Sequence, residues 1–419
     1  MDTKRLYVDF HVLQTVPPSC VNRDDTGSPK TTVYGGAVRA RVSSQAWKHA
    51  MRVMFTEEMS GEVEIGKRTL RAIDLVADEL AELLPGQDRK KLEKMSQDAL
   101  KLAGITFKKS DKKDGEKSDN TSALLLIGKA QATALAKLAV ENCKDDSAYE
   151  DALNENPTVD MVLFGRMVAS APSLNYDAAA QVAHSISTHT VQNEFDYFTA
   201  VDDCAPEDNA GAGHLGTVEY NSATLYRYAT VNVLELVRTL GAERAAQTVR
   251  AFGEAFIRSM PTGKQNSFAN RTLPDAVYVT LRQDQPVNLS RAFEKPVRKS
   301  EEGYAEPSKM ALKQYAKELY NTFAEAPEQS FTVGTGLEEL AQPMPLNTML
   351  AVLEKAVEEK LSGNEVCPWR PYCFGWLHPC SPGVRTPSLR PARPTGNPPK
   401  AAWSACWRRR WGCAETTRR

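Results

Sequence analysis

Strand-like alternation on either side of a long helical stretch constrains this chain more than any other sequence feature. Apolar residues recur at every second position from Leu6 to Val12, and a similar alternation returns from Phe195 to Val201. A period of two is typical of a strand with one buried face. Residues 67–150 are helical in character, with an apolar stripe made of Leu70, Ile73, Leu75, Val76, Leu80, Leu83 and Leu84. The sequence therefore predicts an α+β fold: a mixed sheet domain with a helical insertion and a projecting hairpin.

The same patterns predict further elements. Ser43 and Ser44 are a plausible N-cap for a helix that we expect to run to about Phe55. The other expected helices are 243–257 and 346–361, and the other expected strands are 37–42, 215–220, 225–233 and 276–281. Polar or turn-rich loops are expected at 17–30, 108–119 and 204–213.

Composition changes abruptly near Cys367. The 419 residues carry 52 basic and 53 acidic side chains, a formal net charge of -1. Residues 367–419 hold nine Arg and one Lys against Glu415, a charge of 10 - 1 = +9, which leaves -1 - 9 = -10 for residues 1–366. We expect this tail to be an incidental, disordered extension. Nucleic-acid binding by the acidic remainder would then depend on local basic clusters.

The bulk figures exclude several classes of protein. Hydrophobic residues make up 42% and charged residues 25%, which argues against fibrous or wholly disordered chains. No apolar run approaches the roughly 18 residues that span a bilayer. The charged N-terminus leads into a strand pattern rather than a secretory signal. We therefore expect two or three folding units in the cytoplasm, with no membrane partner.

Hydrogen-bond donors are concentrated between Asn22 and Arg52. They include Arg23, Lys30, Arg39, Arg41, Ser43, Ser44, Gln45, Lys48, His49 and Arg52, and Gly35-Gly36 permits close backbone approach. A helix that starts near Ser43 offers free backbone N–H groups, with Lys48 and Arg52 on one face a turn further on. These groups match two or three consecutive phosphates. A solvated basic helix face with an ordinary cap is the alternative that spacing leaves open.

Two other segments offer polynucleotide contacts. In the strand 194–203, Tyr197 and Phe198 point to opposite faces because they are neighbours, which leaves one of them available to stack on a base. The loop 261–271 supplies donors that include Lys264 and Gln265, and a surface loop without a ligand is the alternative. The loop is not a P-loop, because it lacks the upstream glycine and the following Ser or Thr.

No catalytic or metal-binding motif is complete. Asp24-Asp25 lack a third carboxylate at ligand spacing, so we expect an Asx-type loop cap there rather than a metal site. The string 211–216 fits GxGxxG without the required strand before it and helix after it, so its glycines are expected to serve turns. His184 and His189 lie five apart, and no HExxH or GxSxG occurs. We expect no catalytic residue, metal or cofactor.

Several strings, taken in order, resemble one known family. They are His11–Leu13, Pro18–Asp25, Tyr34–Gly36, Arg41–Gln45 with Lys48, Leu163–Met167, Ala183–His189, Asp196–Asp203, His214–Gly216 and Tyr226–Ala229. From about residue 6 to about residue 360 the chain resembles the backbone subunit of the type I-E CRISPR Cascade complex. The resemblance implies a modified RNA-recognition (ferredoxin-like) palm with a helical fingers insertion and a β-hairpin thumb. The implied bounds are 1–56, 161–192 and 224–366 for the palm, 57–160 for the fingers, 193–223 for the thumb and 367–419 for the unmatched tail.

The resemblance also implies a non-enzymatic subunit that binds CRISPR RNA. In the family, copies stack along the guide spacer, each thumb flips out a base, and the guide pairs with one strand of target DNA in antiviral defence. The implied partners are CRISPR RNA, the target DNA strand, further copies of the chain and other Cascade subunits. The implied RNA contacts are Arg23, Lys30, Ser43, Gln45, Lys48, Met167 at the kink, Phe198 and Leu215 on the thumb, and Lys264 and Gln265, to which the neighbouring donors Ser44 and His49 are added.

A metal-dependent endoribonuclease is the alternative function. Related backbone proteins of other CRISPR types cut RNA, and Asp24 or Asp25 would supply the carboxylate here.

Overall fold

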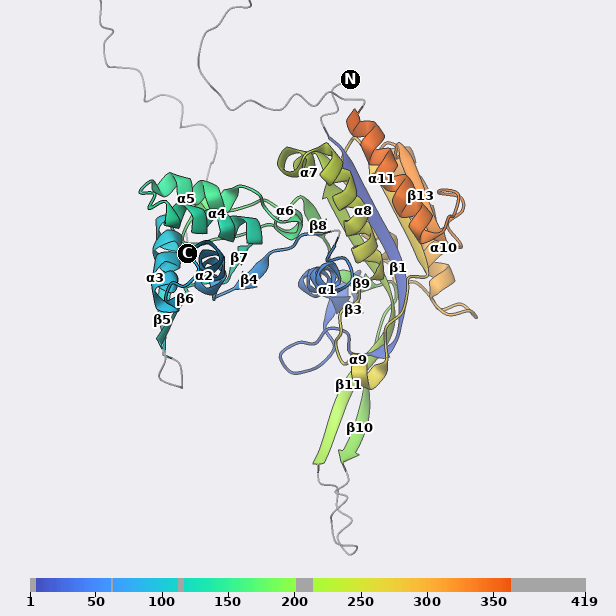
Figure 1. The fold of residues 1–419 in the computed structure, drawn as a ribbon. Helices are drawn as coiled ribbons and strands as arrows, with labels where there is room; N and C mark the ends of the chain where they lie inside the picture. The colour runs from blue at the N-terminus through green and yellow to red at the C-terminus, as the bar shows by residue number, and fades with distance from the viewer. Residues whose placement is uncertain (1–4, 62, 112–116, 201–213, 363–419) are drawn as a thin grey trace, which may run out of the picture. The chain divides into compact units, whose positions relative to one another are not determined.

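The computed structural model describes residues 5–61, 63–111, 117–200 and 214–362 (Figure 1). Side chains at 109–119 and 214–215 also fall outside the described set. The described residues all fall within one unit of the chain, Met1–Pro368. The predicted tail and the predicted loop 204–213 lie outside the described residues. Within the described residues, no helix is long and apolar enough to cross a membrane.

One antiparallel sheet organises the described chain, in the order β13-β12-β1-β11-β9-β3-β2, with β8 and β10 also paired to β11. Its strands are β1 (Tyr7–Ser19), β2 (Thr31–Tyr34), β3 (Ala37–Val42), β8 (Ala180–Val182), β9 (Ser185–Ser187), β10 (Glu194–Ala200), β11 (His214–Asn232), β12 (Ala276–Arg282) and β13 (Gln329–Gly334). β1 lies between β11 and β12 and is antiparallel to both. The prediction of an α+β fold is confirmed, whereas its finer description as a ferredoxin-like palm stays a prediction.

Helices cover both faces of the central strands. The first core contains Val8, Phe10 and Val12 of β1. The helices that pack into it are α1 (Ser44–Glu57), α6 (Val159–Phe164), α7 (Val233–Leu240), α8 (Ala242–Arg258) and α11 (Leu346–Ser362) (Figure 1). On the opposite face, Leu13 packs under η2 (Leu289–Phe293) and α10 (Ala305–Thr322). β1 is thus buried on both faces, whereas its alternating pattern predicts one buried face. The second face carries the polar residue His11, which such a pattern assigns to solvent but which is buried here.

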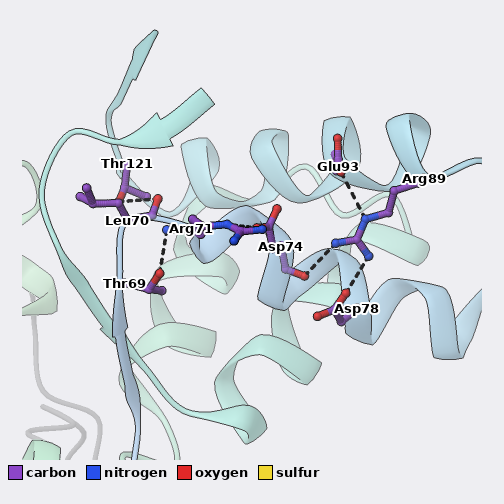
Figure 2. Close-up of polar contacts among 8 residues, drawn as sticks. All are labelled: Thr69, Leu70, Arg71, Asp74, Asp78, Arg89, Glu93 and Thr121. Carbon is purple, nitrogen blue, oxygen red and sulfur yellow. Dashed lines mark hydrogen bonds and ion pairs between the residues drawn. The ribbon is translucent and has the colours of Figure 1, made fainter. Parts of the chain in front are cut away.

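The helical segment has a core of its own. Its helices are α2 (Ala72–Leu83), α3 (Arg89–Leu102), α4 (Lys129–Val140) and α5 (Asp146–Asn154), with β4 (Lys67–Thr69) paired to β7 (Leu125–Ile127). Figure 2 shows polar contacts on its surface: Arg89 donates to Asp78 (2.7 Å) and to Glu93 (3.2 Å). Exposed ion pairs of this kind contribute at most about 1 kcal/mol each. The apolar core therefore stabilises this segment far more than its charges do.

Two loop and strand predictions are wrong. Part of the predicted loop 108–119 forms a hairpin, in which β5 (Phe107–Asp111) pairs with β6 (Lys117–Thr121). The polar composition of these strands hid their pairing. The predicted strands 215–220 and 225–233 are one strand, β11, of 19 residues.

Candidate nucleic-acid interface

The loop between β1 and β2 is fixed to the start of α1 by one asparagine. Asn22 Oδ1 accepts a hydrogen bond from the backbone N–H of Ser43 (2.9 Å), and the Asn22 carbonyl accepts from the N–H of Lys30 (2.9 Å). Because both ends of the loop are held, the exposed Arg23 has a defined place beside the helix start.

Ser43 is the N-cap of α1, as predicted. Its hydroxyl accepts from the N–H of Ala46 at 3.4 Å. Helix geometry leaves the N–H groups of Ser44 and Gln45 without intrahelical acceptors. Gln45 and His49 are exposed one turn apart on the same helix. The predicted donors of α1 therefore lie together.

Asp24 caps the loop in the predicted manner. Its Oδ1 accepts from the hydroxyl of Thr26 (2.7 Å) and from the N–H groups of Thr26 (3.0 Å) and Ser28 (3.0 Å). The hydroxyl of Thr26 is the main cause that holds the pKa of Asp24 below its ordinary value. Among the described residues, no group of three or more His, Cys, Asp or Glu is placed to hold a metal ion.

The loop 261–271 packs against the end of β1 through Gly263. A Cβ at Gly263 would lie 2.1 Å from the carbonyl oxygen of Val21, so only glycine permits this approach. Lys264 follows in a left-handed conformation (φ 48°) and precedes the short helix α9 (Gln265–Phe268). The ring of Phe268 lies 5.7 Å from that of Tyr220 in β11.

This packing brings Lys264 close to Arg23. Burial raises the pKa of the Cys20 thiol, and the positive charges of Arg23 and Lys264 both act to lower it. A hollow of about 490 Å³ is lined by residues 21–27 and Gly263. Two segments separated by more than two hundred residues thus contribute to one surface.

Lys48 extends from α1 toward the end of α6. Its ammonium lies 5.5 Å from the centre of the Phe164 ring. Burial lowers the pKa of Lys48, and the positive charge of Arg68 on β4 lowers it further. Sequence reasoning missed Arg68, because no local pattern distinguishes it from the other exposed arginines.

Met167 is 81% exposed at the rim of a pocket of about 450 Å³. The pocket is also lined by Arg68, Phe164 and Tyr176. Gly165 makes the turn before it, with a φ of 81° that only glycine adopts readily. Lys48 and Met167 therefore belong to one neighbourhood, joined by Phe164.

Lys30 lies apart from α1. Ala40 and Val42 of β3 pack with Trp47 of α1, so Arg41, between them, points to the opposite face of the sheet. Lys30 is on that opposite face too, because its carbonyl accepts from the N–H of Arg41 (2.9 Å) in an antiparallel pair. The predicted single strip of donors is therefore divided between two faces of β3.

Three predicted donor positions have structural roles instead. Arg39 is buried and donates to the carbonyls of Ser187 (3.0 Å) and Phe293 (2.9 Å). Arg52 is paired with Asp160 at 2.9 Å. At Gly35, a Cβ would lie 1.7 Å from the carbonyl oxygen of Glu294, so the glycine admits the protein's own backbone rather than a ligand's.

The β10–β11 hairpin exposes three aromatic rings. Phe195 is 67%, Tyr197 64% and Phe198 41% exposed. Phe198 is paired with Gly216 across the hairpin, and a Cβ at Gly216 would lie 2.3 Å from the Phe198 ring. Gly216 therefore makes room for the ring, rather than serving only a turn as predicted. Leu215 is paired with Thr199, and its side chain lies outside the described set.

In the described part of this region, several cations form no ion pair, although Asp24 and Glu219 act on the same Cys20 thiol as Arg23 and Lys264. Among the described residues, no carboxylate forms an ion pair with Arg23, Lys30, Arg41, Lys48 or Lys264, whereas the neighbouring Arg52 is paired. Cations without ion pairs near the helix N–H groups of α1, together with the exposed rings of the β10–β11 hairpin, suit a polyanion with stacking bases.

The fold and these features define an α+β protein with cations near the start of α1 and a hairpin that exposes aromatic rings. The chain belongs to the CT1975-like protein family, whose model matches residues 8–358. Among curated proteins, none matches the chain.

The chain is also similar to chains of solved structures. A chain of a structure described as "CRISPR RNA-guided surveillance complex, pre-nicking" is 34% identical, with a TM-score of 0.70, over 84% of this chain and 100% of that chain. A second, described as "CRISPR RNA-guided surveillance complex", is 29% identical, with a TM-score of 0.54, over 84% and 99% of the two chains. The chain is therefore similar to subunits of such complexes along nearly their whole length.

Proposed function

We propose that this protein is the RNA-binding backbone subunit of a type I-E Cascade surveillance complex. The observation that carries the proposal is that two distant segments bring Arg23 and Lys264 together beside the start of α1, the helix that also carries Lys48. The similarity to chains of CRISPR RNA-guided surveillance complexes supports it.

In this proposal the central sheet is a modified RNA-recognition palm, the segment 57–160 the fingers and the hairpin 193–223 the thumb. The separate core of the helical segment supports the division into palm and fingers. The exposed rings of β10 support a thumb that wedges against bases, since aromatic side chains stack on any base.

The guide RNA is held by its backbone rather than read by its bases. The α1 donors Ser44, Gln45, Lys48 and His49 and the loop residues Arg23, Lys30, Lys264 and Gln265 bind phosphate and ribose, Met167 lies at the kink, and Phe198 and Leu215 act from the thumb. Sequence reading is left to pairing between guide and target DNA strand, as in other RNA-guided complexes. Further copies of the chain and other Cascade subunits complete the particle in the cytoplasm.

The proposed role is non-enzymatic. Asp24, one of the two carboxylates that the nuclease alternative offers beside Asp25, uses its Oδ1 to hold its own loop together through three hydrogen bonds. That engagement supports a scaffold over a carboxylate-based nuclease.

Coexpression with a CRISPR locus tests the function. We expect the purified protein to carry small RNA of discrete length, and Lys30→Ala with Lys48→Ala to lower the RNA content, because each lost phosphate contact costs about 1 kcal/mol, several-fold in affinity. The matched control is Lys90→Ala with Lys94→Ala, which removes the same charge from exposed positions on α3. Equal RNA content in the two double variants would contradict the proposed surface.

A further inference from the structure

Three basic side chains gather on the face of β3 that points away from α1. Arg41 Nη1 lies 3.3 Å from Nδ1 of His184, and Arg41 Nε donates to the carbonyl of Thr31 (3.3 Å). Arg41 is paired with Ile186 of β9, and His184, two residues before Ile186, shares its face. Lys30 lies opposite Arg41 in the extension of the β2–β3 pair. Neighbouring strands therefore place all three on one patch.

The patch holds its charges close together without a carboxylate. In the described part of the chain, none of the three forms an ion pair with Asp or Glu, although exposed Arg and Lys elsewhere do so. Burial lowers the pKa of His184, and the charges of Arg41 and then Lys30 lower it further. Like charges held this close repel one another, and a bound anion relieves that cost.

The contact with Arg41 also determines which ring nitrogen of His184 can donate a hydrogen bond. Its Nδ1 faces the guanidinium of Arg41, which only donates, so Nδ1 is the acceptor and the proton sits on Nε2. The ring therefore presents one N–H donor beside the two cations. Arg41 and Lys30 are half-buried and His184 is exposed, so the patch has a defined place and remains open to solvent.

We propose that Lys30, Arg41 and His184 form a second phosphate-binding site, which holds the RNA backbone on the face of β3 opposite the α1 donors. This rests on the proposed function and adds two residues, Arg41 and His184, to the RNA surface. An RNA strand that meets both sites passes around the edge of the sheet at β2 and β3 rather than lying along one face of it.

Salt-dependent binding tests the site. The full chain, purified free of RNA, is titrated with a single-stranded RNA at several salt concentrations. Each phosphate contact to a single strand contributes about -0.7 to the slope of log K against log salt. We expect Arg41→Gln to weaken binding and to reduce the slope by about 0.7, and Arg41→Lys to keep the slope because it keeps the charge. Arg244→Gln, at an exposed arginine on α8, is the matched control and is expected to behave as wild type.

The histidine gives an independent readout. His184 is followed by NMR, with His184→Gln to assign its signal, and its pKa is expected to rise when RNA is added, because a phosphate offsets the repulsion from Arg41 and Lys30. Either of two results would overturn the second site and leave the proposed function standing. One is an unchanged pKa of His184 with RNA bound. The other is a wild-type slope of log K against log salt in Arg41→Gln while Lys48→Ala weakens binding. Absence of RNA binding by the wild-type chain would remove both.

Discussion

Asp9 and His11 are two buried titratable groups on the same face of β1. Asp9 accepts from the hydroxyl of Tyr228 (3.0 Å) and the N–H of Val287 (2.8 Å). Burial raises its pKa from 3.8 to about 6. His11 is stacked near Tyr228 and Tyr278, and burial lowers its pKa from 6.5 to about 3.

These two shifts have opposite effects on stability. Between pH 6.5 and 3 the unfolded chain binds a proton at His11 that the folded chain does not, so stability falls as the pH falls through this window. Between pH 6 and 3.8 the folded chain binds a proton at Asp9 that the unfolded chain does not, so stability rises as the pH falls. From pH 6 to 3.8 the two contributions therefore oppose each other.

Asp9→Asn is expected to remove the Asp9 contribution to the pH dependence of stability and to leave the opposing His11 contribution in place. The variant loses stability because an amide cannot accept both bonds. Its free energy of unfolding is also expected to fall more steeply than wild type from pH 6 to 4, by up to about 1.4 kcal/mol per pH unit. Urea unfolding at several pH values measures this slope, with Asp25→Asn, in an exposed loop, as the control. Parallel curves for wild type and Asp9→Asn would contradict the account.

Residue types in the sequence predicted a group of hydrogen-bond donors between Asn22 and Arg52, but not which of these side chains would be buried. Arg39 and Arg41 occupy the same face of β3, yet Arg39 is buried against carbonyls supplied by Ser187 and Phe293. Those acceptors come from far along the chain, so no local pattern reports them. Asp24 was predictable because its partners, Thr26 and Ser28, are local.

At the scale of elements, the hairpin of β10 and β11 depends on one glycine. The Phe198 ring occupies the space that a Cβ at Gly216 would fill, and the two residues are directly paired. The ring position is therefore set by the partner strand rather than by a core beneath it.

Gly216→Ala is expected to displace the Phe198 ring and to weaken the proposed base flipping without unfolding the protein. In assembled particles that carry 2-aminopurine at single guide positions, the fluorescence of unstacked bases is expected to fall in Gly216→Ala and in Phe198→Ala. Thr217→Ala, opposite Tyr197, is the control. The free energy of unfolding, measured by thermal denaturation, is expected to change by no more than about 0.5 kcal/mol, as for other surface positions. Wild-type fluorescence in Gly216→Ala would show that the ring position is not what matters.

Elements with strong local signals were predictable, and those defined by distant partners were not. The cap at Ser43 and the periodicity after it located α1, and alternation located β3. β11 was read as two strands because polar Asn221 interrupts its pattern. In the structure Asn221 is paired with Ser19 and donates to Asn193 Oδ1 (3.0 Å), so the strand continues through it.

At the scale of the whole molecule, residues 1–366 carry a charge of -10, and the proposed RNA surface is a small basic exception. A single copy with a few phosphate contacts on an acidic body binds RNA weakly, and binding falls further with salt. Strong binding then requires several copies that contact one another on one strand, because a bound copy then holds its neighbour at a raised effective concentration.

Affinity is therefore expected to rise steeply with RNA length. An RNA long enough for one copy should bind weakly, and each further length that admits another copy should lower the concentration of protein at half-saturation. Native mass spectrometry counts the copies on each RNA, and titration gives the midpoint. Lys48→Ala should shift the midpoint more on a long RNA than on a short one, since every bound copy loses the contact, whereas Lys90→Ala should shift neither. Equal affinity for short and long RNAs would show that one copy suffices, and the backbone role would then fail.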